Sequence, residues 1–349
     1  MPNKITDHEE MLESTPRFIF AGQLRRDFVL FPDGRTRLDV LGGNLPYAAA
    51  GLAVWDPKAQ PGLVARVGED YPQAWLAELE QRGFDTKGIR ILPEALDLRS
   101  FYVYSDRTTR HSDDPVVQCA RLGMPVPRPL LGYRPPSQTY DSRTRLSSTS
   151  LRQADIPEDY LDASSAHLCP SDFLTQTLLP AVLRQHGFTT VSLDPARGSM
   201  TPSFWDDIPA MVIGLTAFLP SETELRALFH GRSSDLWEMV DTLAGYGCEL
   251  VVVKRGERGQ LLYDALSHAR YEISAYPARL ADPTGAGDAF CGGFLAGYRR
   301  TYDPLEAVLY GSVSASLTIE GSGAFFALDA LPGLAQARLE ALREAVRKI

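Results

Sequence analysis

The sequence predicts an α/β protein in which a mostly parallel sheet is covered by helices on both faces. The first observation is that short apolar runs of strand length alternate with longer segments of helical periodicity along most of the chain. Such alternation is typical of parallel sheets, because each crossover helix returns the chain to the same edge. The second is that 349 residues with 44% hydrophobic side chains are sufficient for a large core.

The first part of the chain is expected to contain strands, a hairpin and two helices. Pro32, Asp33 and Gly34 form a turn signal between two strand-like runs, so residues 28–40 are predicted to form a β-hairpin. Apolar runs and helical periodicity give the other elements, which are strands at 17–22, 63–67 and 100–104 and helices at 47–54 and 71–82.

Residues 106–157 differ in composition from the rest of the chain. They are rich in proline, arginine, serine and threonine, and their apolar periodicity is poor. We interpret them as a long surface insertion, while a functional element of a lid stays open as the alternative. After the insertion the alternation resumes, with strands expected at 189–193, 211–215 and 250–253 and helices at 174–186, 222–229, 236–246 and 289–299.

Composition and charge exclude several classes of function. With 35 basic and 44 acidic side chains the formal net charge is −9, which argues against a general nucleic-acid-binding protein. No apolar run approaches the roughly 18 residues that a membrane-spanning helix needs. Residues 1–16 form a polar extension without the pattern of a signal peptide. The four cysteines and six histidines are scattered, so neither a zinc site nor a disulfide framework is expected, and a cytoplasmic location is predicted.

The most informative segment is Asp-Pro-Thr-Gly-Ala-Gly-Asp at residues 282–288, directly before a predicted helix. Gly285, Ala286 and Gly287 lack large side chains, so a ligand can approach the backbone N–H groups at the helix N-terminus. This arrangement suits the charge that develops on a transferring phosphoryl group. Asp288 is placed to accept the proton of an attacking hydroxyl group. The alternative is that Asp288 only caps the helix.

This segment resembles the C-terminal signature of the PfkB/ribokinase family of carbohydrate and nucleoside kinases, with Pro283 in place of the usual threonine. The resemblance implies that Asp288 is the catalytic base and that the Gly-Ala-Gly turn holds the transferring phosphate. Asp282 and Thr284 match positions that help to bind a monovalent cation such as K⁺ in some members. The implied fold is a ribokinase-like domain over residues 17–349, with lid strands at about 24–40 and 97–106.

Other segments resemble the acceptor side of the family's site. Asp27 matches an aspartate that bonds sugar hydroxyl groups, and Arg25 lies beside it. Gly42 and Gly43 resemble the diglycine that lets the backbone lie against the sugar. Tyr47 stands where the family usually has asparagine, so the pattern of hydroxyl contacts is altered, and Asn44 is a candidate to compensate.

The nucleotide side resembles the family less closely. Lys254, Gly256 and Gly259 follow an apolar run and resemble a nucleotide-binding loop, although a tight turn with a solvated lysine would look the same. Ser312 and Gly323 match contact positions of the helix and loop that close the adenine pocket.

A further segment resembles the element that organises Mg²⁺ through water. Glu224 matches that element and Ser221 replaces its asparagine, while the alternative for Glu224 is an ordinary carboxylate in the first turn of a helix. Arg197 is a candidate phosphate or substrate contact, with a surface ion pair as its alternative, and Ala196 stands where several members have asparagine.

The resemblance implies an ATP-dependent kinase that moves the γ-phosphoryl group to a hydroxyl group of a small sugar or polyol, with Mg²⁺ bridging the phosphates. A nucleoside kinase is the nearer alternative, because lid aromatics could stack on a base. A catalytically quiet ligand-binding relative is the other. Pairing of lid strands between subunits makes a homodimer a further expectation. The alternative for these aromatics is that they simply pack the lid against its domain. The aromatic candidates are Tyr47, Phe28, Phe31, Phe101 and Tyr102.

Overall fold

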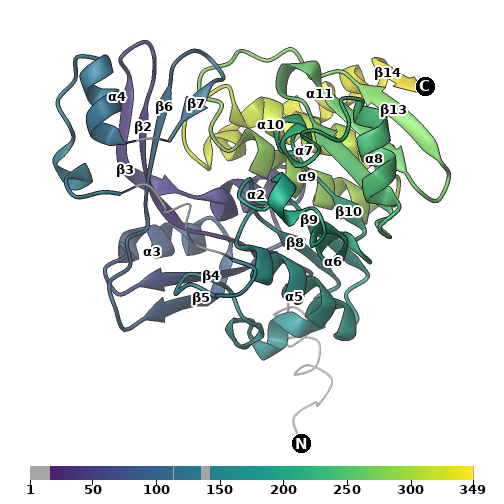
Figure 1. Cartoon of the computed structure of the whole chain (residues 1–349), viewed down its shortest axis with the longest axis horizontal. Coiled ribbons are helices and arrows are strands. Elements are labelled where there is room, and N and C mark those ends of the chain that lie inside the picture. Colours follow the sequence, from purple (N-terminus) through teal and green to yellow (C-terminus); the bar gives the residue numbers. More distant parts are fainter. Residues whose placement is uncertain (1–15, 113, 135–141, 349) are drawn as a thin grey trace, which may run out of the picture.

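A computed structural model describes residues 16–112, 114–134 and 142–348 of the chain (Figure 1). The predicted polar extension lies outside these residues, except for Pro16. Within them the chain forms a ten-stranded sheet flanked by helices and a separate four-stranded sheet, which confirms the predicted α/β class. No helix of this described part is long and apolar enough to cross a membrane.

The large sheet has the strand order β14-β13-β12-β11-β10-β9-β8-β1-β4-β5. Pairing is parallel from β11 to β5 and antiparallel from β11 to β14. The strands are β1 (Phe18–Ala21), β4 (Gly62–Gly68), β5 (Asp85–Leu92), β8 (Ser165–Leu168), β9 (Thr190–Leu193), β10 (Ala217–Phe218), β11 (Leu250–Lys254), β12 (Gln260–Asp264), β13 (Ala269–Ile273) and β14 (Val346–Lys348).

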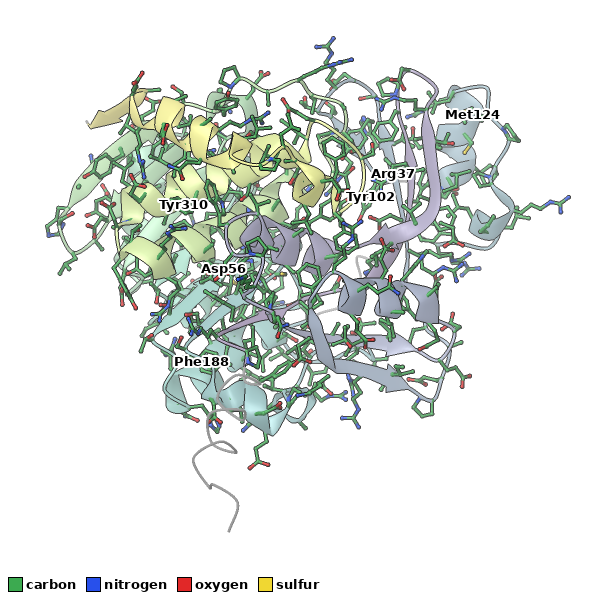
Figure 2. The ribbon with its side chains drawn as sticks, turned by 180° about the vertical axis from the view of Figure 1, so that it is seen from behind. Arg37, Asp56, Tyr102, Met124, Phe188 and Tyr310 are labelled. Atoms are coloured by element: carbon green, nitrogen blue, oxygen red, sulfur yellow. The ribbon has the colours of Figure 1, made fainter. Side chains whose placement is uncertain are left out.

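Helices cover both faces of this sheet. Successive residues of a strand point to opposite faces, so each strand contributes side chains to two cores. Ile19 packs in one core and its neighbour Phe20 in another. Helices α5 (Phe173–Gln185), α6 (Ile208–Val212), α7 (Glu222–Leu228) and α8 (Leu236–Ala244) cover the face seen in Figure 1. Helices α2 (Asn44–Ala53), α3 (Gln73–Gln81), α9 (Ala286–Thr301), α10 (Pro304–Thr318) and α11 (Leu334–Arg343) cover the other face, which is turned to the viewer in Figure 2.

The small sheet, called the lid below, projects from the large one. Its strands run in the order β3 (Thr36–Gly42), β2 (Arg25–Leu30), β6 (Arg99–Tyr104) and β7 (Arg110–His111), and β2 and β3 form the predicted antiparallel hairpin. The side chains alternate between its faces. Phe28 and Phe101 pack on the outer face, whereas Phe31, Tyr102 and Tyr104 pack on the inner face.

The first part of the insertion covers the outer face of the lid. Helix α4 (Pro115–Arg121) and the turn after it bury Cys119 and Leu130 against Phe28 and Phe101, and Met124 packs beside them (Figure 2). This part of the insertion is therefore packed structure rather than a loose surface loop. Short 3₁₀ turns occur here and elsewhere, at Arg128–Leu130, Gln153–Asp155, Glu158–Asp162, Pro202–Phe204, Gly256–Arg258 and Phe326–Asp329.

The strand expected at 211–215 is wrong. Its first two residues end helix α6, and the strand of this unit, β10, follows at Ala217–Phe218. Pro209 near the start favours a helix, and Gly214, with a φ of 72°, turns the chain toward the sheet. The other strands and helices expected from periodicity are confirmed within a few residues at their ends.

Candidate active site

A cleft of about 1910 Å³ lies at the carboxyl ends of the parallel strands, under the inner face of the lid. Asp194 follows β9 and Lys254 ends β11, so both reach the cleft from strand ends. Ligands of open α/β sheets bind at this edge. Most of the predicted site residues line this one cleft, although they are distant in the sequence.

The Gly-Ala-Gly turn forms the N-terminus of α9 at the floor of the cleft. Gly285 caps the helix with a φ of 76°, and a Cβ there would lie 2.1 Å from the ring of Tyr47. Glycine is therefore required at this position both by conformation and by packing. A Cβ on Gly287 would lie 3.5 Å from the ammonium of Lys254. The first N–H groups of a helix lack partners within it and favour an anion, although the N–H of Ala286 donates to the carbonyl of Pro283 at 3.3 Å.

Asp288 lines the cleft in the first turn of α9. Burial, and then the nearby charge of Asp194, raise the pKa of Asp288 to about 7, while Lys254 and Arg110 act in the opposite direction. A carboxyl group with a pKa near neutrality can exchange a proton at physiological pH, as a general base must.

Lys254 and Asp194 form an ion pair beside Asp288. The ammonium lies 2.5 Å from Oδ2 of Asp194, and both atoms lie 3.6 Å from the thiol of Cys291. Burial raises the pKa of Asp194 to about 6 against the effect of Lys254. Burial alone would lower the pKa of Lys254, but the charge of Asp194 outweighs it and raises this pKa, so the lysine stays charged.

Asp27 lies across the cleft, on strand β2 of the lid. A Cβ on Gly42 would lie 2.0 Å from its carboxyl carbon, and the N–H of Gly43 donates to its Oδ2 at 3.4 Å. The absence of side chains at Gly42 and Gly43 therefore lets their backbone lie in contact with the carboxyl group of Asp27. Burial raises the pKa of Asp27 to about 6. Its Oδ1 is buried and accepts no hydrogen bond, which makes it an acceptor that a ligand hydroxyl group would satisfy.

The other candidates on the acceptor side have structural partners. The side-chain amide of Asn44 accepts from the N–H of Gln23 at 2.8 Å and donates to the carbonyl of Pro170 at 2.6 Å. Arg25 donates to the side chain of Gln23 at 2.7 Å. Tyr47 is 1% exposed, and its ring lies against Gly285. These residues line the cleft, but they shape it more than they offer free groups to a ligand.

The candidates on the nucleotide side divide into two groups. Lys254, Gly256 and Ser312 line the cleft. Gly259 has a structural reason to be glycine, because its φ is 77° and a Cβ there would lie 1.9 Å from a carbonyl oxygen of β13. Neither Gly259 nor Gly323 is among the residues that line the cleft.

Glu224 has a capping role in helix α7 and a position at the cleft. It is the third residue of α7 and forms a capping box with Ser221, since its Oε2 accepts from the N–H of Ser221 at 2.8 Å. It also lines the cleft, as do Ser221 and Arg197. Asp194 and Asp288 line the same cleft, and carboxylate oxygens are the donors that Mg²⁺ prefers, although the three side chains do not form one metal-ligating cluster.

Asp282 and Thr284 do not fit a monovalent cation, because their side chains have protein partners. Oδ1 of Asp282 accepts from the N–H of Thr284 at 2.9 Å, and Oδ2 accepts from Arg37 at 3.0 Å. The hydroxyl group of Thr284 is hydrogen-bonded to that of Tyr104 at 3.1 Å. Among the described residues no cluster of three metal-ligating side chains occurs.

Sequence reasoning missed three residues that face or adjoin the site, namely Arg37, Arg110 and Asp194. Arg110 stacks on Tyr102, 4.6 Å from the ring centre, and its charge acts on both Asp27 and Asp288. None of the three belongs to a complete motif, so only their position in space reveals them. Asp194 begins a segment that the resemblance marked, but the candidate chosen there was Arg197.

Only some of the aromatic side chains that are candidates for stacking on a base line the cleft. Phe28 and Phe101 belong to the outer face of the lid, under the insertion, and cannot reach a ligand in the cleft. Phe31 and Tyr102 do line the cleft. The period of two in a strand separates the pairs, because successive residues point to opposite faces.

Comparison with known proteins gives consistent matches. Residues 143–331 match the model of the pfkB family of carbohydrate kinases. A cytidine kinase from Thermococcus kodakarensis is 31% identical over 291 residues, which cover 82% of this chain and 90% of that protein. A ribokinase II candidate from E. coli, solved with ATP and Mg²⁺, has a TM-score of 0.67 at 19% identity and covers 94% of this chain and 99% of its own. A nucleoside kinase from Burkholderia thailandensis, solved with inosine, has a TM-score of 0.66 at 18% identity over 93% and 97% of the two chains.

Proposed function

The chain belongs to the pfkB family of carbohydrate kinases, and from this premise we propose that it transfers the γ-phosphoryl group of ATP to a hydroxyl group of a nucleoside. One observation carries the proposal. Asp288, with a pKa raised to about 7, lies at the N-terminus of α9 and lines the same cleft as Asp27, which has a buried and unpartnered oxygen. The first group suits a base and the second an anchor for the acceptor.

In the proposed reaction Asp288 accepts the proton of the acceptor hydroxyl group as its oxygen attacks the γ-phosphorus. The new oxygen–phosphorus bond forms while the bond to the bridging oxygen of ADP breaks, and ADP leaves. The N–H groups at the Gly-Ala-Gly turn that have no protein partner, and the ammonium of Lys254, would stabilise the charge on the transferring group. Asp27 orients the acceptor.

Mg²⁺ and the lid complete the proposal. Glu224 would hold the ion through water, using the carboxylate oxygen that does not cap α7. When bound, the ion would neutralise charge on the phosphates. The small sheet, with strands at about 24–40 and 97–106, would act as a lid that excludes water from the cleft, which limits wasteful hydrolysis of ATP.

Two observations favour a nucleoside over a simple sugar. A relative that matches 82% of this chain at 31% identity is a cytidine kinase. Phe31 and Tyr102 line the acceptor side of the cleft, where a base could stack, and Asp27 suits the hydroxyl groups of a ribose. A free sugar or polyol is the second candidate, because Asp27 would bind its hydroxyl groups equally well.

The test is ADP release from Mg-ATP with a panel of nucleosides, sugars and polyols, followed by mass spectrometry of the product. We expect release with at least one nucleoside and a product heavier by one phosphoryl group. Release with sugars alone would move the assignment to the second candidate. If ATP binds but no acceptor supports release, the chain is a ligand-binding relative rather than a kinase, and the proposal is wrong.

A further inference from the structure

Three contacts join the lid to the loop that precedes the Gly-Ala-Gly turn. Arg37 on β3 bonds Asp282 at 3.0 Å, Tyr104 on β6 bonds Thr284 at 3.1 Å, and Arg35 donates to the carbonyl of Ala281 at 2.9 Å. The first contact differs from the others, because it pairs two opposite charges that are both largely shielded from solvent. The side chain of Arg37 is 14% exposed and that of Asp282 is 2% exposed.

A buried carboxylate at Asp282 needs a positive charge close by. Asp282 lies three residues before Gly285, so its negative charge acts near the place where the transferring phosphate would lie. An unpaired buried charge is strongly unfavourable, and a second anion nearby increases the cost. The counter-charge can come either from an ion in solution or from the chain itself.

Arg37 fills this role in the structure. Its Nη1 lies 3.0 Å from Asp282 and 3.4 Å from the hydroxyl group of Tyr47. A Cβ on Gly323 would lie 3.8 Å from its Nη2. The guanidinium is thus enclosed by Asp282, Tyr47 and the loop at Gly323. It is always charged and its geometry is fixed, so it leaves Asp282 no oxygen free for an ion.

We propose that Arg37 supplies, from within the chain, the positive charge that a monovalent cation supplies in some relatives, so that this chain needs no K⁺. The inference rests on the proposed phosphoryl transfer for its effect on rate, but the absence of ion binding stands independently of it. Tyr47 helps to hold Arg37 in this position, because its ring packs against Gly285 and its hydroxyl group accepts from Arg37 at 3.4 Å.

The first measurement compares ADP release in KCl and in choline chloride at equal ionic strength. The wild-type rate should be the same in both within about twofold. Arg37→Met should lose about 10- to 100-fold in choline chloride, because Asp282 would then be buried without its counter-charge close to the Gly-Ala-Gly turn. It should recover in KCl as the ion takes the vacated place. Arg37→Lys, which keeps the charge, should remain independent of K⁺.

The matched control is Arg26→Met. Arg26 is on the same hairpin, but it pairs with Asp39 at 2.6 Å and does not line the cleft, so its loss should leave the rate and the response to K⁺ unchanged. The double variant Arg37→Met/Asp282→Asn removes both charges. It should fold without a buried unpaired carboxylate, and it should not respond to K⁺.

Titration calorimetry with Tl⁺, a monovalent cation of similar size to K⁺, tests without turnover whether the wild type binds such an ion. We expect no binding to the wild type and binding to Arg37→Met. Saturable Tl⁺ binding to the wild type, or activation of the wild type by K⁺, would overturn the inference. So would an Arg37→Met protein that is impaired but neither binds Tl⁺ nor recovers in KCl. If no acceptor supports ADP release, calorimetry still decides this inference, whereas the failed release counts only against the proposed function.

Discussion

The two halves of the cleft are built differently. The phosphate half consists of the N-terminus of α9 with Asp288, Lys254 and Asp194, and its charged groups lie close together, with the lysine and Asp194 paired at 2.5 Å. The acceptor half is the inner face of the lid, where Asp27 has an unpartnered oxygen and Arg110 is exposed. If the proposed roles hold, the charged groups for the chemistry are already paired within the protein, whereas Asp27, the proposed anchor of the acceptor, keeps one oxygen free for a ligand.

The largest expected effect is that of Asp288→Asn. Without a base for the hydroxyl proton, turnover should fall about 10²- to 10⁴-fold. The measurement is acceptor-dependent ADP release, with calorimetric binding of ATP as the check that the site is intact. If turnover falls less than tenfold while ATP binds normally, Asp288 is not the base. The phosphate half of the cleft would then lack the catalytic group assigned to it.

Lys254→Met should have the next largest effect. It removes a positive charge beside the anion site and leaves Asp194 buried without its partner, so we expect a loss of about 10²-fold in turnover and roughly 3 kcal/mol in the free energy of unfolding. The control is Arg255→Met, because Arg255 is the next residue but pairs with Glu272 at 2.7 Å outside the cleft. Equal losses in both variants would show that the effect of Lys254 is not specific to the site.

Asp27→Asn should act mainly on the acceptor. The carboxylate offers stronger hydrogen bonds to hydroxyl groups than an amide does, so we expect the KM of the acceptor to rise about 10- to 30-fold. Steady-state kinetics at saturating ATP measures this change. An unchanged KM for the acceptor would show that the acceptor binds elsewhere in the cleft.

The pH dependence of the rate should follow Asp288. Because the base must be ionised and its pKa is raised to about 7, kcat should fall as pH decreases below this value and level off above it. Between pH 7 and pH 5 the decrease should approach about tenfold per pH unit. A profile that is flat from pH 5 to pH 8 would mean that the group with the raised pKa is not the base.

The smallest effect on rate is expected from the cover of the lid. Leu130 is 3% exposed and packs against Phe28 and Phe101, so Leu130→Ala should lower the free energy of unfolding by about 2–4 kcal/mol. Turnover at a temperature where the variant is folded should change little, since the outer face does not touch the cleft. Denaturant unfolding and ADP release measure the two quantities, and a large loss of turnover in the folded variant would contradict a purely structural cover.

The same contrast explains what the sequence could predict. The groups at residues 285–288 are contiguous, so one local pattern identifies the turn, the helix and Asp288 together. The pairs Asp194–Lys254 and Arg37–Asp282 join residues 60 and 245 positions apart, and no periodicity or motif connects them. The strand expected at 211–215 failed for a related reason, because a short apolar run fits a buried helix as well as a strand.

The most direct test of this division is a comparison of kcat and the acceptor KM in Asp288→Asn and Asp27→Asn with the same acceptor. The account predicts that Asp288→Asn lowers kcat and leaves the KM within a few-fold, whereas Asp27→Asn raises the KM with a smaller change in kcat. Both variants losing kcat alike, with unchanged KM values, would contradict a cleft in which one half performs the chemistry and the other selects the acceptor.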